Sequence, residues 1–367
     1  MVDEFEESLS VLTLAFHRGI IIEEQFVLFV HALEEDLLRK AQRERTFGPR
    51  LDIQKLEDEQ CQLFFRFKYD ELLRLKDALH IQDIMRAPNG TKWSGLEGLC
   101  VLLQRLSYPN RLRDLEVFFG RGVTDLGIIA NFICLQICHQ FDRLLSDFAN
   151  QPWFTAERLA RYCAGIAEKC DIEGVEGLQL WGFIDGTVRR CCRPIRHQNL
   201  LYNGYKKVHC LKFQTVVTPD GMIASIFRPM EGKRHDAAVL RESHLVNYIR
   251  QNIPAFHAAG HGQLYGDSAY PLCPEILTPF KHHVTPDQQL FNTTMSGVRM
   301  SVEWGYKEIC THFAFVDFHK NMKVLLQPVG AYYRVATLLT NCLNCLCRNQ
   351  TSRHFGIEPP ELEDYLQ

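Results

Sequence analysis

The stretch "GLQLWGFIDGT", residues 177–187, is an apolar run that ends in an aspartate. Its large apolar side chains predict a buried strand over 178–185, with Asp185 at the tip. A second short run, "GQLYGDSAY" (262–270), places Asp267 in the same way after a strand. A single aspartate in this position is usually a turn residue or a helix cap. Two of them raise the question of whether they meet.

The residues between and after these strands predict an alternation of strand and helix. The β-rich runs 206–217 and 222–228 are separated by Pro219-Asp220-Gly221, which predicts a hairpin turn. Residues 234–252 have the spacing of one amphipathic helix, and a long helix is expected around 296–313. Strands mixed with helices in this order predict a mixed α/β layer fold.

The first 90 residues are expected to be helical and acidic. The first sixty hold fourteen Asp or Glu against seven Lys or Arg. Apolar residues recur every three or four positions, which predicts two helices before the Gly48-Pro49 break and one further helix over 64–79. Either partner binding or a solvated helical face would account for the acidic surface.

Residues 91–150 have the order of a helix-turn-helix: a helix over 94–106, a short helix over 111–119, and a long helix opened by Thr124 or Asp125. The arginines around the turns are candidates for phosphate contacts. These are Arg105, Arg111, Arg113 and Arg121. Taken alone, the pattern slightly favours a plain three-helix bundle, because the last helix has few basic residues for reading bases.

The composition is that of a soluble globular protein, with 46% hydrophobic and 23% charged residues. The acidic start has no basic segment before an apolar run, so we expect no secretory signal and an intracellular protein. No apolar stretch is long enough to predict a membrane span. The fourteen cysteines are expected to be reduced, without a structural zinc site, because no second ligand pair follows "CLNCLC" at finger spacing.

Four carboxylates are candidates for one site. Asp185 and Asp267 follow strands, Asp236 opens the intervening helix, and Glu303 lies on the long helix that follows. Each alone has an ordinary structural explanation. Together they would repel one another unless cations neutralised them, and hard oxygen ligands suit Mg²⁺ or Mn²⁺. Two such ions, about 3.5–4 Å apart, suit the cleavage of phosphodiester bonds.

Basic residues near these carboxylates are candidates for DNA contacts. We expect a basic loop directly after Asp185, and further lysines and an arginine close by. The candidates are Arg189, Arg190, Arg193, Lys206, Lys207 and Arg299. Arg299, one helical turn before Glu303, is expected to orient that glutamate or to contact DNA. A solvated basic surface is the alternative for the others.

The blocks "GFIDGT", "YNGYKKVHCLKFQTVVTPDG", "GKRHDAAVLRES", "YGDSAYPL" and "RMSVEWGYKEI" resemble successive blocks of PIF/Harbinger transposases and of the nucleases derived from them. The resemblance runs over about 178–350 and more loosely over 94–145. It implies an RNase H-like catalytic core. It also implies a DDE triad of Asp185, Asp267 and Glu303, with Asp236 as a further metal-associated carboxylate.

The resulting domain scheme has five parts. They are an acidic helical region (1–90), a helix-turn-helix-like domain (91–150), a helical connector (151–177), the DDE endonuclease domain (178–350) and a C-terminal tail (351–367).

The function implied is a DNA endonuclease or transposase that uses Mg²⁺ or Mn²⁺ and cuts by in-line attack of water, with strand transfer as a further step. The resemblance also implies a separate Myb/SANT-like DNA-binding partner and a nuclear location that becomes cytoplasmic without the partner. A homo-oligomer is a further candidate, and the sequence leaves the oligomeric state open. The alternatives are a domesticated, catalytically silent DNA-binding or scaffolding protein, and an RNase H-like enzyme acting on RNA.

Overall fold

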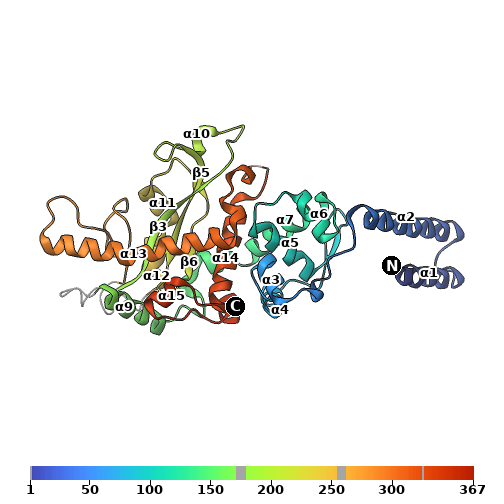
Figure 1. Ribbon diagram of the computed structural model, residues 1–367, viewed down its shortest axis with the longest axis horizontal. Coiled ribbons are helices and arrows are strands. Elements are labelled where there is room, and N and C mark those ends of the chain that lie inside the picture. The colour runs from blue at the N-terminus through green and yellow to red at the C-terminus, as the bar shows by residue number, and fades with distance from the viewer. Residues whose placement is uncertain (1, 171–178, 254–261, 325) are drawn as a thin grey trace. The chain divides into compact units, whose positions relative to one another are not determined.

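The computed structural model describes residues 2–170, 179–253, 262–324 and 326–367 (Figure 1). It divides the chain into two compact units. One contains the chain up to Lys55 together with residues 110–128, and the other contains residues 56–109 and 129–367. The predicted boundaries of the helical domains stay a prediction.

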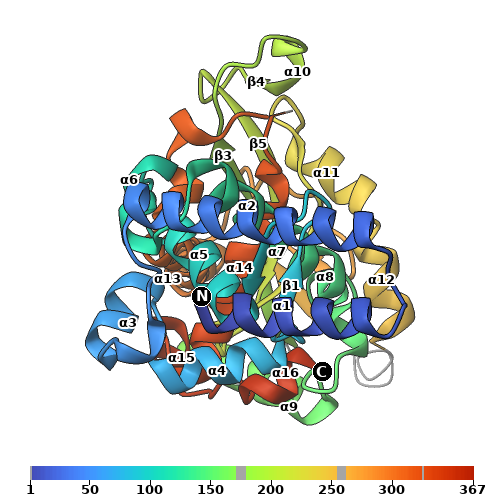
Figure 2. The same cartoon turned by 90° about the vertical axis from the view of Figure 1, so that its right-hand side faces the viewer.

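The first unit contains two helices that pack side by side, α1 (Val2–His17) and α2 (Glu23–Phe47) (Figure 2). The rings of Phe16 and Phe26 stack across the connection, with centroids 5.1 Å apart. This confirms the two helices expected before the Gly48-Pro49 break. The unit also holds the turn η1 (Ile53–Lys55) and α6 (Leu112–Phe119).

The second unit begins with two helices where the sequence predicts one. The segment 64–79 is interrupted by Arg66, which adopts φ of 73° and ends α3 (Asp58–Phe65) before α4 (Tyr69–Ala78) begins. Its guanidinium fixes this break by donating to the carbonyl oxygens of Leu63, Ser107 and His312. A non-glycine residue in the left-handed region has no sequence signal, so the single-helix prediction was wrong.

The other helices before the sheet include the predicted ones, α5 (Gly95–Ser107) and α7 (Val123–Gln140), and α9 (Ala156–Cys170) in the predicted helical connector. The short helix α8 (Asp142–Ser146) and the turn η2 (Phe148–Asn150) were not predicted. The short hairpin β1 (Ile84–Arg86) and β2 (Lys92–Ser94) precedes α5, whose N-cap Ser94 accepts from the amide of Glu97. Among the described residues no single helix is long and apolar enough to cross a membrane; α6 and α7 pass that test only as a pair bent by 97°.

A mixed sheet forms the centre of the second unit, in the order β4-β5-β3-β8-β9, with β6 and β7 also pairing with β5. β5 is antiparallel to β3, whereas β8 is parallel to β3 and β9 is parallel to β8. The strands are β3 (Leu180–Arg190), β4 (Tyr202–Asn203), β5 (Val208–Val217), β6 (Ile223–Ile226), β7 (Met230–Glu231), β8 (Gln263–Tyr265) and β9 (Ile276–Leu277). This arrangement confirms the mixed α/β class and is consistent with an RNase H-like fold.

Helices cover both faces of the sheet: α13 (Pro286–His312) on one face, and α11 (Asp236–Ser243) with α12 (Leu245–Asn252) on the other (Figures 1 and 2). The predicted helix over 234–252 is broken at His244, which adopts φ of 53°. The helix expected around 296–313 begins ten residues earlier. Thr285 and Gln288 form a capping box there, and Pro286 occupies the first turn, where its missing amide hydrogen costs nothing.

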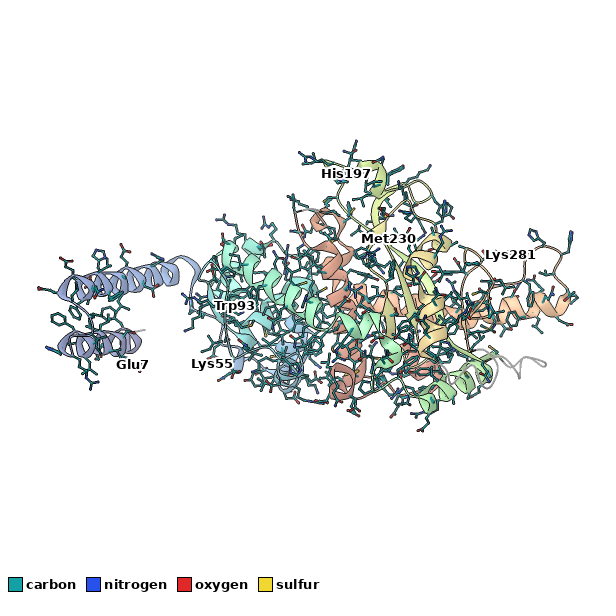
Figure 3. All side chains as sticks on the ribbon, turned by 180° about the vertical axis from the view of Figure 1, so that it is seen from behind. Glu7, Lys55, Trp93, His197, Met230 and Lys281 are labelled. Carbon is teal, nitrogen blue, oxygen red and sulfur yellow. The ribbon has the colours of Figure 1, made fainter. Side chains whose placement is uncertain are left out.

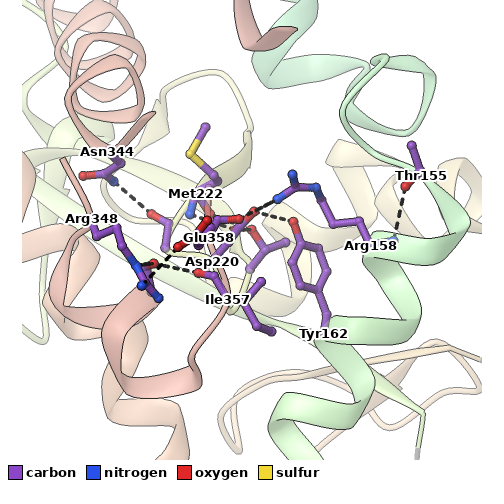
Figure 4. Close-up of polar contacts among 12 residues, drawn as sticks. Thr155, Arg158, Tyr162, Asp220, Met222, Asn344, Arg348, Ile357 and Glu358 are labelled. Atoms are coloured by element: carbon purple, nitrogen blue, oxygen red, sulfur yellow. Dashed lines mark hydrogen bonds and ion pairs between the residues drawn. The ribbon is translucent and has the colours of Figure 1, made fainter. Parts of the chain in front are cut away.

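The hairpin turn at Pro219-Asp220-Gly221 joins β5 to β6 as predicted, and it is buried. Gly221 adopts φ of 80°, and Asp220 accepts from the hydroxyls of Thr218 and Tyr162 and pairs with Arg158 at 3.1 Å (Figure 4). The buried turn therefore links the sheet to α9. Asp220 was predicted only to form a turn, but it also holds α9 against the sheet through Tyr162 and Arg158.

The C-terminal part of the chain packs into the same unit. The turns η4 (Ala314–Asp317) and η5 (His319–Asn321) lead to α14 (Val329–Leu346), α15 (Gln350–Phe355) and α16 (Leu362–Leu366). Asn341 of α14 donates to Ile223 of β6 and to Tyr365 of α16. The segment expected as a tail thus contains two helices, and the apolar residues of α16 are buried.

Candidate active site

The two aspartates that follow the predicted strands lie at the same level of the sheet. Phe183 of β3 pairs with Tyr265 of the parallel strand β8, and each aspartate lies two residues further on. Asp185 is in the middle of β3, which corrects the prediction that it ends the strand. β3 continues to Arg190 because it remains paired with β5, whereas β8 ends beside Phe183. Beyond Phe183, the edge of β3 that faces β8 is therefore unpaired, and Asp267 follows the end of β8 beside it.

The carboxylate of Asp185 is largely buried and is held by Arg299 of α13. Nη2 of Arg299 lies 2.6 Å from Oδ1 of Asp185, and the side chains are 20% and 15% exposed. The pKa of Asp185 is raised to about 6: burial is the main cause and nearby Asp267 adds to it, while Arg299 and the amide of Gly186 act in the opposite direction. Arg299 was predicted to orient Glu303 or to contact DNA; its partner in this structure is Asp185.

Asp236 lies near these aspartates but against the other face of the sheet. Because successive residues of a strand point to opposite faces, Gly186 faces away from Arg299. A Cβ atom at Gly186 would lie 2.1 Å from Oδ1 of Asp236, so only glycine leaves room for this carboxylate. Nζ of Lys212 lies 2.9 Å from the same oxygen. That approach is an ion pair and not an aligned hydrogen bond, so Oδ1 lacks a hydrogen-bond partner among the described residues.

Two tyrosines line the same region, and neither was predicted to belong to the site. Tyr306 of α13 shares a hydrogen bond with Thr215, the residue opposite Asp185 on β5. Tyr270 is 2% exposed, and its hydroxyl has no hydrogen-bond partner among the described residues. Burial raises the pKa of both phenols, and the charge of Asp185 raises it further. Both tyrosines therefore stay protonated beside the carboxylates.

Glu303 is exposed on α13, one turn after Arg299. At 100° per residue, its position lies about 40° around the helix from that of Arg299, so the two residues are on the same side of α13. Within the ranges that the structure describes, no three His, Cys, Asp or Glu side chains are close enough to hold a metal ion. Glu303 thus belongs to no formed ligand group here.

The donor set at Asp185 and Asp267 suits a hard divalent cation. Both ligands are carboxylates, the type that Mg²⁺ and Mn²⁺ prefer. The charge of Asp267 contributes to the raised pKa of Asp185, and Asp185 already binds a cationic group, that of Arg299. A divalent ion would replace this pairing and relieve the repulsion. Oδ1 of Asp236, which forms an ion pair with Lys212 but accepts no hydrogen bond from a described residue, is a further oxygen ligand candidate, on the far side of β3.

The predicted DNA-contact arginines lie in different surroundings. Arg111, the N-cap residue of α6, and Arg113 within that helix are exposed, and they form ion pairs with Asp114 and Glu116 of α6. Arg121 is buried, as is Arg105, whose guanidinium lies 4.1 Å from the ring centre of Phe315.

The basic residues after Asp185 also divide into two groups. Arg189 is in β3 and not in a loop. It is packed inward, donates to Sγ of Cys310 at 2.9 Å and lies 4.7 Å from the ring centre of Tyr333. In contrast, Arg190, Arg193, Lys206 and Lys207 are exposed. They belong to a projection that ends near His197 (Figure 3).

Comparison with known proteins identifies one family. The model of the family described as DDE superfamily endonuclease matches residues 184–341, which include Asp185, Asp236, Asp267 and Glu303. No curated protein and no solved structure matches the chain. The match confirms the superfamily part of the resemblance, and the PIF/Harbinger type stays a prediction. Residues 184–341 therefore carry a DDE superfamily endonuclease domain.

Proposed function

We propose that this protein is a divalent-metal-dependent DNA endonuclease whose site is built on Asp185, Asp267 and Glu303. The observation that supports it most directly is the register of β3 and β8, which sets Asp185 and Asp267 side by side within the matched domain. A largely buried carboxylate such as Asp185, with a second carboxylate beside it, costs stability unless a cation compensates it, and this cost supports cation binding.

Each residue has a distinct part in this proposal. Asp185 and Asp267 hold Mg²⁺ or Mn²⁺, and Glu303 completes the ligand set from α13. Such ions activate water and stabilise the leaving oxygen of a phosphodiester. Arg299 neutralises Asp185 in the metal-free protein and, once released, contacts the phosphate of the substrate. Tyr270 and Tyr306 exclude water from the inner side of the site. The metal-associated role of Asp236 remains a prediction.

The wider expectations belong to the same proposal. Strand transfer would use the 3′-hydroxyl freed by cleavage as the next nucleophile. A separate Myb/SANT-like protein would provide sequence recognition and nuclear import, and a homo-oligomer would bring two DNA ends together. Retention of the chain in the cytoplasm without such a partner, and entry into the nucleus with it, would support this division of roles.

One observation favours a second candidate, a catalytically silent DNA-binding or scaffolding protein. Glu303 is exposed and joins no group of metal ligands among the described residues. An active site needs the glutamate to reach the aspartates once ions and DNA are present. The silent protein has no such requirement.

The test is Mg²⁺- or Mn²⁺-dependent cleavage of supercoiled DNA by the wild type, Asp185→Asn and Glu303→Gln. Asp77→Asn, an exposed aspartate beside Lys76, is the matched control. We expect both site variants to lose at least a hundredfold in rate and the control to remain active. Wild-type protein without metal-dependent cleavage would support the silent candidate, and an active Asp185→Asn variant would refute the site. Comparing the rates of cleavage of duplex DNA and of an RNA–DNA hybrid shows whether the substrate is DNA or RNA.

A further inference from the structure

The projection formed by residues 188–211, here called the arm, has an unusual charge distribution. It comprises the end of β3, a loop, α10 (Gln198–Leu201), β4, a turn and the start of β5 (Figure 1). From residue 186 to residue 219 the sequence has seven Lys or Arg and no Asp or Glu. The arm is therefore a continuous source of positive potential that begins three residues after Asp185.

Most of this charge faces solvent. The exposed cations of the arm are Arg190, Arg193, Arg196, Lys206 and Lys207, and none of them forms an ion pair with a residue that the structure describes. Nε of Arg193 donates to the side-chain oxygen of Gln198 instead. Like charges held close together without counter-charges are unfavourable in a free protein, so the arrangement favours an anionic partner.

The arm also exposes two large side chains. Ile195 is 91% exposed and Tyr205 is 90% exposed, the highest values among the exposed large hydrophobic side chains of the described residues. Both lie within two residues of an exposed cation, and Nζ of Lys206 is 5.7 Å from the ring centre of Tyr205. A basic surface that only contacts water does not account for two large apolar side chains that are almost fully exposed. Their partner must be anionic and also present apolar faces.

The turn that carries Tyr205 is held in place before any partner binds. The side-chain oxygen of Asn203 accepts from the amide of Lys206 at 2.8 Å, and its side-chain nitrogen donates to the carbonyl of Gly232 at 2.8 Å. Lys207 adopts φ of 55°, which reverses the chain into β5. At the base of the arm, β7 pairs with Leu211 and Lys212. A fixed turn lowers the entropic cost of using Tyr205 as a contact.

We call the exposed side chains of Ile195 and Tyr205 the tip of the arm. We propose that the tip stacks on unpaired or unstacked bases of DNA, while the surrounding cations contact the flanking phosphates. Bases are flat and apolar, and they are joined by anionic phosphates, so DNA matches both features of the tip. The choice of DNA as the polymer rests on the proposed function, but the inference does not require the protein to cleave DNA.

The position of the arm supports DNA over an anionic membrane. Arg190 is five strand residues beyond Asp185, roughly 17 Å at about 3.3 Å per residue. A duplex that has one phosphate at Asp185 and runs along β3 would therefore reach Arg190 after about five base pairs. A membrane surface would need no such alignment with the carboxylates.

The test is equilibrium binding of the full chain to fluorescent DNA in EDTA, which prevents cleavage. The probes are a paired 30-base-pair duplex and the same duplex with a four-nucleotide mismatched bubble. We expect the wild type to bind the bubble about tenfold more tightly, within the range measured for stacking of single bases on aromatic side chains. Ile195→Ala/Tyr205→Ala should bind both probes with similar affinity, and Tyr205→Phe should keep the preference.

Two comparisons make the result specific. Tyr108→Ala, at a tyrosine that is 60% exposed elsewhere in the same unit, should behave as the wild type. Arg190→Gln/Lys206→Gln should weaken both probes by similar factors and reduce their salt dependence. Equal affinity of the wild type for both probes, or an unchanged preference in the tip variant, would overturn the inference. So would tip-dependent binding to phosphatidylserine vesicles without a bubble preference.

These outcomes are separate from the test of cleavage. A bubble preference that depends on the tip, without cleavage that depends on Asp185, would retain the inference and refute the proposed nuclease. Cleavage that depends on Asp185, with no effect of the tip, would refute the inference alone.

Discussion

Asp185 and Asp267 each lie two residues beyond Phe183 and Tyr265, which pair across the neighbouring parallel strands β3 and β8. Asp185 is still in β3, whereas Asp267 follows the end of β8, and the pairing of the two strands brings together segments that are 82 positions apart in the chain. Their mutual repulsion contributes to the raised pKa of Asp185, and Arg299 compensates it from α13. The pairing of β3 and β8 thus brings two carboxylates close together, and a bound cation would remove the repulsion between them.

The pH dependence of stability follows from the pKa of Asp185, which is about 6 in the folded chain. The pKa of an unfolded aspartate is about 3.9, so the folded state holds this proton more tightly, and stability is lost as the pH rises from 4 to 6. Above pH 6 the cost is about 3 kcal/mol. In EDTA, Asp185→Asn should be more stable than the wild type by up to about 3 kcal/mol at pH 8 and by about half of that at pH 5. Urea denaturation at both pH values measures this; a variant that is less stable at pH 8 would contradict it.

Removing Arg299 should have the opposite effect. Arg299→Met leaves the Asp185 carboxylate without its cation, and we expect a loss of about 2–4 kcal/mol at pH 8 in EDTA. In an Asp185→Asn background the loss should fall below about 1 kcal/mol, because no charge is left to compensate. Lys307→Met, at an exposed lysine of α13, is the control. Equal losses in both backgrounds would show that Arg299 acts through packing and not through Asp185.

Gly186 tests the contact that positions Asp236. Gly186→Ala places a Cβ atom against Oδ1 of Asp236, and we expect a loss of about 1–3 kcal/mol from the forced rearrangement. Gly297→Ala on α13 has no atom within 4 Å and should gain about 0.5–1 kcal/mol from helix propensity. Thermal unfolding of both variants compares them. A neutral Gly186→Ala variant would mean that Asp236 is free to move.

The buried turn at Asp220 makes a prediction independent of the site. Arg158→Met leaves the carboxylate of Asp220 fully buried without its cation, retaining hydrogen bonds from Thr218 and Tyr162 (Figure 4). A loss of about 3–5 kcal/mol is expected. Arg161→Met, on the same helix, should change stability by less than about 0.5 kcal/mol. Similar losses for the two variants would show that α9 tolerates an unpaired Asp220.

Those parts of the fold that depend on local chemistry could be predicted from the sequence. The hairpin at Pro219–Gly221 follows from turn residues, and the strand before Asp267 from its apolar run. The breaks at Arg66 and His244 could not be predicted, because non-glycine residues in the left-handed conformation leave no mark in the pattern.

The candidate site was only partly predictable for a related reason. The order of strands and helices suggests which carboxylates approach one sheet edge, and Asp185 and Asp267 do lie together there. The sequence does not specify which face each residue occupies. The placement of Asp236 opposite Arg299 depends on the alternation of β3 and on glycine at residue 186. Arg189 and Arg190 are consecutive arginines, yet one is packed inward and the other is exposed, because they point to opposite faces of β3.

The most direct test of the central claim is calorimetric titration of Mn²⁺ into the wild type, Asp185→Asn, Asp267→Asn and Asp77→Asn at pH 8 and low salt. If Asp185 and Asp267 share a cation, the wild type and Asp77→Asn bind Mn²⁺ with similar affinity, and each site variant loses at least tenfold. Binding that survives both site substitutions, or a wild type that binds no Mn²⁺, would contradict the account.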